Sequence, residues 1–225
     1  MDSIGRLVMQ FGGRGRLEEH PPGVVDGARF EGRFVIFALA DQDGAVFGPD
    51  VSLFDSALVE RLGRGAQSAH LVAVRSGITL EGFVTDEGDD FVGHVYGRSS
   101  LETRMRIYFD PAPDGSRHFD DRQAFTSGEL VATYQAEEYF QINPRAGVFD
   151  TRVSYSLISS APFTFKGKTV DLGKMYPRLV EISHGNNPEP DPNPEPIPDE
   201  APFSYREPGV FANRFPVGGS LFVVS

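Results

Sequence analysis

Hydrophobic and polar positions alternate over most of the chain between residues 30 and 166. Short stretches rich in Phe, Val, Ile and Tyr recur there, and turns that contain Gly, Asp or Ser separate them. This arrangement is typical of an antiparallel barrel or sandwich. The predicted strands are 30–40, 70–74, 78–84, 91–98, 101–110, 129–142, 148–158 and 163–166.

One segment has a helical period instead. An apolar residue recurs every four positions from Phe54 to Leu62, which gives a single apolar stripe. Ser52 and Asp55 have the spacing of a capping box, in which two side chains satisfy the first free amides of a helix. The pattern predicts one short helix near 52–62.

These elements predict an all-β fold. We expect an antiparallel barrel of about eight strands with one short helix, and a sandwich is the alternative. Calycin-type and related small barrels share this architecture, but an analogy of fold carries little information about function.

The composition changes at Asn186. From 188 to 198, Pro alternates with acidic and other residues, which predicts an extended spacer of polyproline type. The segment beyond it is rich in aromatic residues and ends in the apolar run Leu221–Val224. We expect this segment to pack on the barrel or on a neighbouring subunit, and the run to add to an open sheet edge.

The predicted organisation therefore has three parts. They are a β-barrel domain (1–185), a Pro-rich acidic linker (186–202) and an aromatic C-terminal segment (203–225).

Composition narrows the classes of function. The chain has no Cys, which excludes disulfides, thiolate metal sites and cysteine nucleophiles. Its net charge of −11 argues against nucleic acid or an anionic membrane as partner. No apolar run has the length of a signal peptide or a membrane span. We expect a soluble, cytoplasmic protein, and a signal peptide already removed is the open alternative.

Two predicted hairpins indicate which side chains point inward. A two-residue turn at 99–100 puts His94 opposite Met105. The same register puts Tyr96 opposite Thr103, and these four side chains then share the apolar face.

The second hairpin turns at 144–147, where four residues end in Gly. Its register puts Glu138, Tyr134 and Tyr155 on the inner face and leaves an outer face that is almost entirely polar. The predicted inner pairs are Phe140–Thr151, Glu138–Val153, Ala136–Tyr155 and Tyr134–Leu157.

This inward set indicates a ligand-binding interior. We predict Glu138 and His94 as catalytic residues, because burial raises the pKa of a carboxyl group into the range useful for proton transfer. The predicted substrate-binding residues are Tyr96, Thr103, Met105, Tyr134 and Tyr155. The alternative is purely structural, with Glu138 in water at the barrel rim and His94 as an ordinary core histidine.

Two polar groups are weaker candidates for metal binding. His118 with Asp120 and Asp121 fits no recognised spacing, and the acidic turn 86–90 resembles at most a weak calcium site. We interpret both as solvated turns and expect neither a metal nor a cofactor.

The sequence thus predicts a barrel that binds an apolar small molecule. In its enzymatic form it is a cofactor-free cyclase or isomerase for a polyketide- or terpenoid-like substrate, working by shape and proton transfer. The alternative is a non-enzymatic assembly protein that uses the Pro-rich and C-terminal segments, including a homodimer formed through the tail.

Overall fold

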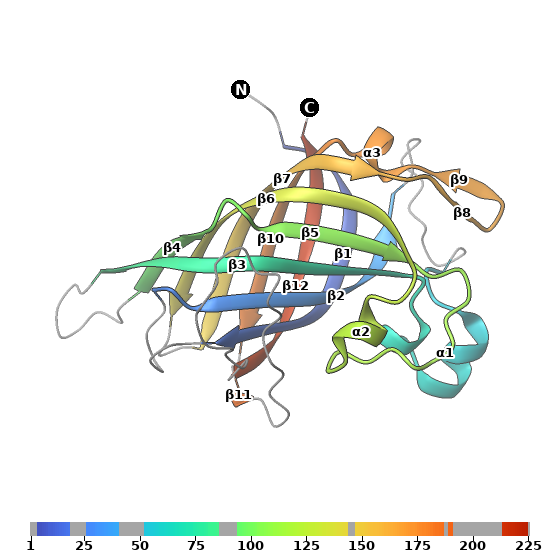
Figure 1. Cartoon of the computed structure of the whole chain (residues 1–225), viewed down its shortest axis with the longest axis horizontal. Coiled ribbons are helices and arrows are strands. Elements are labelled where there is room, and N and C mark those ends of the chain that lie inside the picture. Colours follow the sequence, from blue (N-terminus) through green and yellow to red (C-terminus); the bar gives the residue numbers. More distant parts are fainter. Residues whose placement is uncertain are drawn as a thin grey trace.

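A computed structural model describes residues 4–18, 26–40, 52–85, 94–143, 147–186, 189–190 and 213–224. Eight strand positions form a closed antiparallel barrel (Figure 1), which confirms the predicted all-β barrel. In order around the barrel they are β1 (Ile4–Glu18), β2 (Arg29–Leu39), β3 (Leu71–Thr85), β4 (His94–Ser99) in line with β5 (Arg104–Phe109), β6 (Glu129–Asn143), β7 (Val148–Ser160), β10 (Arg178–Asn186) and β12 (Asn213–Val224).

The C-terminal strand closes the barrel. One edge of β12 pairs with β1 and the other with β10, so that Leu221 lies opposite both Met9 and Glu181. The two-residue strand β11 (Glu189–Pro190) extends the sheet beside the start of β12. The barrel therefore includes residues beyond 185, where the sequence-based division ended it. Most of the predicted linker and the segment 201–212 lie outside the described residues.

The predicted register of β6 and β7 is confirmed. Glu138 pairs with Val153 and Ala136 with Tyr155. The other two predicted pairs, Phe140–Thr151 and Tyr134–Leu157, are also present. The inner side chains of this hairpin are buried, whereas Glu137 and Ser154 on the outer face are exposed.

The predicted hairpin at 99–100 is wrong. β4 and β5 do not pair with each other, because both pair with β3 on one side and with β6 on the other. Between them the chain makes a local turn, in which the Thr103 amide donates to the Ser100 carbonyl, and then continues in the same strand position. His94 accordingly pairs with Thr85 rather than Met105.

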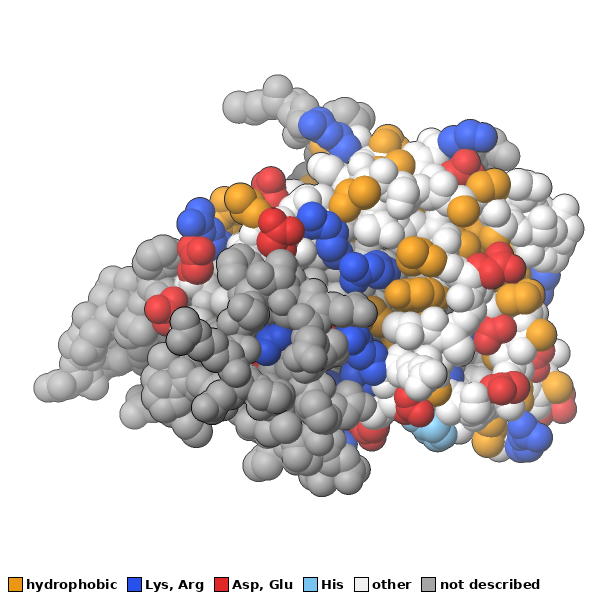
Figure 2. Space-filling view, in the orientation of Figure 1, with side chains coloured by type: hydrophobic (Ala, Val, Ile, Leu, Met, Phe, Trp, Pro, Cys, Tyr) orange, Lys and Arg blue, Asp and Glu red, His pale blue; other side chains and the backbone are white. Residues whose placement is uncertain are grey.

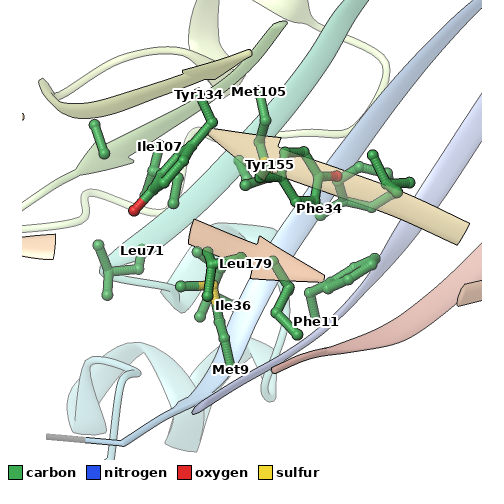
Figure 3. Close-up of a cluster of buried hydrophobic side chains, with 14 of the residues drawn as sticks. Met9, Phe11, Phe34, Ile36, Leu71, Met105, Ile107, Tyr134, Tyr155 and Leu179 are labelled. Atoms are coloured by element: carbon green, nitrogen blue, oxygen red, sulfur yellow. The ribbon is translucent and has the colours of Figure 1, made fainter. Parts of the chain in front are cut away.

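Aromatic side chains fill much of the barrel interior. Figure 3 shows buried side chains from several strands, among them Met105, Tyr134 and Leu179, gathered in one cluster. Inward glycines leave room for the rings, since a Cβ on Gly15 would lie 2.7 Å from ring atoms of both Phe30 and Phe215. Small residues on one strand thus face large rings from its neighbours.

Short helices cover the outside of β2 and β3 at one end of the barrel (Figure 1). They are α1 (Ser56–Leu62), the 3₁₀ turn η1 (Ala66–Ser68) and α2 (Arg122–Phe125). A second apolar cluster forms beneath them, in which Phe54 and Phe125 pack with Val72. Asp55 caps α1 through the Leu58 amide, so the helix begins one turn later than the predicted capping box at Ser52 implied.

The remaining elements follow β7. They are the hairpin β8 (Phe163–Phe165) and β9 (Lys168–Val170), and the one-turn helix α3 (Leu172–Met175). Asp171 caps α3 through two backbone amides, those of Gly173 and Lys174. Among the described residues, no helix has the length and apolar character needed to cross a membrane.

Candidate functional site

Five of the seven predicted site residues have buried side chains. They are Thr103, Met105, Tyr134, Glu138 and Tyr155. His94 and Tyr96 lie in β4, and their side chains fall outside what the structure describes. The site below is therefore built from the other five residues and their neighbours.

Glu138 projects from β6 into the barrel and is fully buried. Its Oε1 atom lies 3.4 Å from Nη2 of Arg75 on β3. Within the described part of the chain, neither carboxyl oxygen of Glu138 has a hydrogen-bond partner. A buried carboxyl group without hydrogen bonds is costly, so this position calls for an explanation beyond packing.

Arg75 reaches the interior because β3 alternates, with Leu71, Ala73 and Arg75 pointing inward. Its Nη1 atom donates to Glu181 Oε1 at 2.9 Å and to the Tyr155 hydroxyl at 3.2 Å. The guanidinium also lies 5.5 Å from the ring centres of Phe30 and Phe34. Aromatic faces attract such a cation, most strongly where water is excluded.

Glu181 on β10 is the well-paired carboxylate. Besides Arg75, it accepts hydrogen bonds from the Tyr155 hydroxyl at 2.5 Å and from the Ser183 hydroxyl. Thr151 and Ser183 share a further hydrogen bond of 2.6 Å. Arg75, Glu138, Thr151, Tyr155, Glu181 and Ser183 are called the interior polar cluster below.

The charges of this cluster are unequal, because one guanidinium faces two carboxyl groups. Burial raises the pKa of Glu138 to about 7; Arg75 offsets part of the rise and Glu181 adds to it. Burial by itself would lower the pKa of Arg75, but the charges of Glu138 and Glu181 outweigh it and raise that pKa above its ordinary value. Glu138 is thus able to exchange a proton near neutral pH while Arg75 stays charged.

Burial and the negative charge of Glu181 raise the pKa of Tyr155 well above its ordinary value. Its hydroxyl group therefore stays protonated at neutral pH and donates to Glu181. This contact holds Glu181 in place, and Glu181 in turn fixes the guanidinium of Arg75.

Three of the predicted substrate-binding residues have other contacts. The Tyr134 hydroxyl donates to the Tyr176 carbonyl at 3.1 Å, which ties α3 to the barrel. The Thr103 hydroxyl donates to the Ser100 carbonyl at 2.8 Å, within the turn between β4 and β5. Met105 lies opposite Arg75 and Tyr134 in the sheet and packs in the apolar core.

Sequence reasoning missed Arg75 and Glu181. The signal for each was present, because both continue an alternating inward series: Leu71–Ala73–Arg75 on β3 and Leu179–Glu181–Ser183 on β10. The segment 70–74 was read as ending before Arg75, and 178–186 was not assigned to a strand.

Two of the weaker candidates, Asp120 and Asp121, have structural partners. Asp120 pairs with Arg14 and Arg16, each at 3.1 Å, and so attaches the 110–128 connection to β1. Within the described ranges, no group of three or more His, Asp or Glu side chains is placed to hold a metal ion. The acidic turn 86–90 lies outside those ranges.

One pocket of about 370 Å³ lies on the outer face of β6, β7 and β10. Its lining includes Gln135, Glu137, Ser154 and Arg178, and it opens to solvent. The wider surface carries intermixed acidic, basic and apolar side chains (Figure 2). The interior polar cluster is the stronger candidate site, because it contains a buried carboxyl group without a hydrogen-bond partner in the described chain.

The chain matches no protein-family model. Comparisons with curated proteins and with solved structures also give no match. The fold and the site therefore assign the protein only to a structural class. It is a closed eight-stranded antiparallel barrel with a buried cluster of ionisable side chains in its interior.

Proposed function

We propose that this barrel binds an apolar small molecule and that Glu138 moves a proton to or from it. The reaction class is a cofactor-independent isomerisation or cyclisation. The observation that carries the proposal is the fully buried Glu138 carboxyl group, which has no hydrogen-bond partner among the described residues.

Three properties of this site support the proposal. A general acid or base works best when its pKa is near the working pH, and the pKa of Glu138 is about 7. The surrounding wall is aromatic and aliphatic, as in pockets that bind apolar ligands. Arg75 provides a fixed positive charge 3.4 Å from the carboxyl group, suited to stabilising negative charge that develops on a substrate.

Native mass spectrometry of the purified protein, before and after denaturation, tests for a retained ligand. We expect a mass excess that denaturation removes. The barrel loaded with that ligand is then placed in D₂O to measure proton transfer. The ligand should take up deuterium on the wild-type protein and on Glu137→Gln, but not on Glu138→Gln.

Glu137→Gln is a matched control because Glu137 is the adjacent residue, has the same side chain and is exposed on the outer face. A bare protein mass, together with no binding of the uncharged fluorescent probe N-phenyl-1-naphthylamine, would overturn the proposal. Equal deuterium uptake on both variants would remove Glu138 from the mechanism.

The fold bears on one of the two segments that the assembly alternative uses, the C-terminal run. Both edges of β12 are paired inside the barrel, so Leu221–Val224 has no free edge to add to another subunit. The assembly alternative, with a homodimer formed through the tail, stays a proposal.

A further inference from the structure

One edge of the Arg75 guanidinium has no hydrogen bond to any described residue. Its contacts to Glu181 and Tyr155 both use Nη1. Nε and Nη2, which form the opposite donor edge of the planar group, have no hydrogen-bond partner among the described residues. Arg75 is nevertheless completely buried, so these donors are withdrawn from bulk water.

The Arg75 donors that lack a hydrogen bond within the described residues lie beside the carboxyl oxygens of Glu138, which also lack one. Nη2 of Arg75 is 3.4 Å from Oε1 of Glu138, and both Glu138 oxygens also lack hydrogen-bond partners in the described chain. Buried donors and acceptors are normally satisfied by protein or by ordered water. Here a strong donor edge and a proton-exchanging carboxyl group form an ion pair, and neither has a hydrogen bond within the described residues, while Glu181 and Tyr155 hold the guanidinium from its other side.

Resting on the proposed function, we infer that the ligand carries a neutral carbonyl oxygen, which accepts from Arg75 Nε and Nη2 and is adjacent to a carbon that Glu138 deprotonates. The C–H bond breaks, its proton goes to the Glu138 carboxylate, and its electron pair forms an enolate whose oxygen Arg75 stabilises. Return of the proton to the same carbon exchanges it. Return to a different carbon of an extended enolate shifts a double bond, and neither outcome needs an oxidant or reductant.

Charge selects a neutral carbonyl over the other acceptors. The cluster already contains two carboxyl groups and one guanidinium, so a ligand carboxylate would add a further uncompensated negative charge in the interior. A ligand ammonium group has no lone pair, so it cannot accept hydrogen bonds from Nε and Nη2 of Arg75. A carbonyl group adds no charge and still accepts two hydrogen bonds from the free edge.

The inference assigns two different roles to members of the interior polar cluster. Arg75 and Glu138 are the groups that contact the carbonyl compound. Glu181 and Tyr155 are positioning residues, since they act through Nη1 of Arg75.

Two pairs of probes test the inference, each pair differing only in a carbonyl group. They are acetophenone against ethylbenzene and 2-acetonaphthone against 2-ethylnaphthalene, measured by displacement of N-phenyl-1-naphthylamine. We expect each ketone to bind the wild-type protein at least about tenfold more tightly than its hydrocarbon, the size of a hydrogen bond to a charged donor. In D₂O the methyl group of each ketone should exchange on the wild-type protein and on Glu137→Gln, but not on Glu138→Gln.

The outcomes separate this inference from the proposed function. Binding of ketone and hydrocarbon with equal affinity would overturn the carbonyl inference and leave an apolar pocket in place. Failure of all four probes and of the fluorescent compound to bind would overturn both. Because the comparison between ligands uses the wild-type protein, it does not depend on whether Arg75 variants fold.

Arg75→Lys keeps the charge and removes the planar donor edge. If it folds, the ketone preference should fall to near unity. An unchanged preference in the folded variant would show that another donor holds the carbonyl, and an ordered water molecule would then account for the free edge of Arg75.

Discussion

Arg75 Nη2 and Glu138 Oε1 lie 3.4 Å apart inside the barrel, while Nη1 of the same guanidinium makes a 2.9 Å hydrogen bond to Glu181. The two carboxyl groups thus share one cation unequally. Glu181 has hydrogen-bond donors on both oxygens, whereas Glu138 has none within the described residues. Two buried carboxyl groups have only one cation between them, and Glu138 is therefore the group whose ionisation is more unfavourable.

This inequality predicts that the barrel loses stability as the pH rises. The pKa of Glu138 is about 7 in the folded protein against an ordinary value of 4.5, so the folded state binds more protons between these pH values. The free energy of unfolding should then fall from pH 4.5 to pH 7, by about 3 kcal/mol for this group. This is the opposite of the usual behaviour of a carboxyl group, whose folded pKa is depressed.

Urea unfolding at pH 5 and pH 8 measures the effect. The stability of wild type relative to Glu138→Gln should be lower at pH 8 than at pH 5, because Gln cannot ionise. Glu137→Gln should follow the wild-type pH dependence. A wild-type-to-Glu138→Gln difference that stays constant across this pH range would contradict the assignment.

Tyr155→Phe should cost more stability than Tyr134→Phe, although both tyrosines are buried. The Tyr155 hydroxyl donates to the buried Glu181 carboxylate, and its loss leaves a charged acceptor short of a donor, at a cost of about 1–3 kcal/mol. The Tyr134 hydroxyl donates to a neutral carbonyl, that of Tyr176, so its loss should cost about 1 kcal/mol. Chemical denaturation of the two variants ranks them directly, and the reverse order would show that Glu181 finds another donor.

The sequence predicted the fold best where one face of a hairpin is polar. Outer residues such as Glu137 and Ser154 are polar, and their inward neighbours are apolar apart from Glu138, so a register shifted by one residue would bury several more polar side chains. This pattern, together with the four-residue turn predicted at 144–147, indicates the register of β6 and β7 that is observed.

The prediction failed at 99–100 for a physical reason as well. Two adjacent serines are typical of a hairpin turn, but here Ser99 and Ser100 stay beside β3 and β6. The Ser100 hydroxyl donates to the Gly77 carbonyl of β3, which keeps the chain in the same strand position. A local turn inside a strand cannot be distinguished from a hairpin turn by the residues it contains.

Strand β1 was not predicted because glycines at 13 and 15 interrupt the apolar series of its inner face. A Cβ on Gly13 would lie 1.9 Å from the Arg33 carbonyl oxygen, so the backbones approach too closely for any side chain. The candidate site was predicted only in part, because the two strands that supply its ion pair differ in how clearly the sequence marks them. Glu138 was found through a well-defined hairpin, whereas Arg75 lies just past a segment read as a short apolar strand.

Gly15→Ala should destabilise the barrel and Gly12→Ala should not. The new Cβ at position 15 would lie 2.7 Å from ring atoms of Phe30 and Phe215, and such overpacking typically costs about 1–3 kcal/mol. At position 12 the nearest atom is a Phe37 ring carbon at 3.5 Å, an ordinary contact. Thermal unfolding of the two variants compares the same chemical change at two positions three residues apart, on opposite faces of β1. Equal stabilities would mean that the aromatic rings rearrange freely.

Removal of residues 203–225 should prevent the barrel from folding, because β12 occupies a strand position between β1 and β10. Without it, the backbone groups of Met9 and Leu179 and of their neighbours along both strands lose their partners, and the interior loses Phe215 and Leu221. Exposed sheet edges of this length promote aggregation. We expect the truncated chain to be insoluble or unfolded by circular dichroism, and a synthetic peptide of residues 213–224, added during refolding, to restore β structure by filling the gap. A truncated chain that stays folded and monomeric without the peptide would show that the sheet closes without β12.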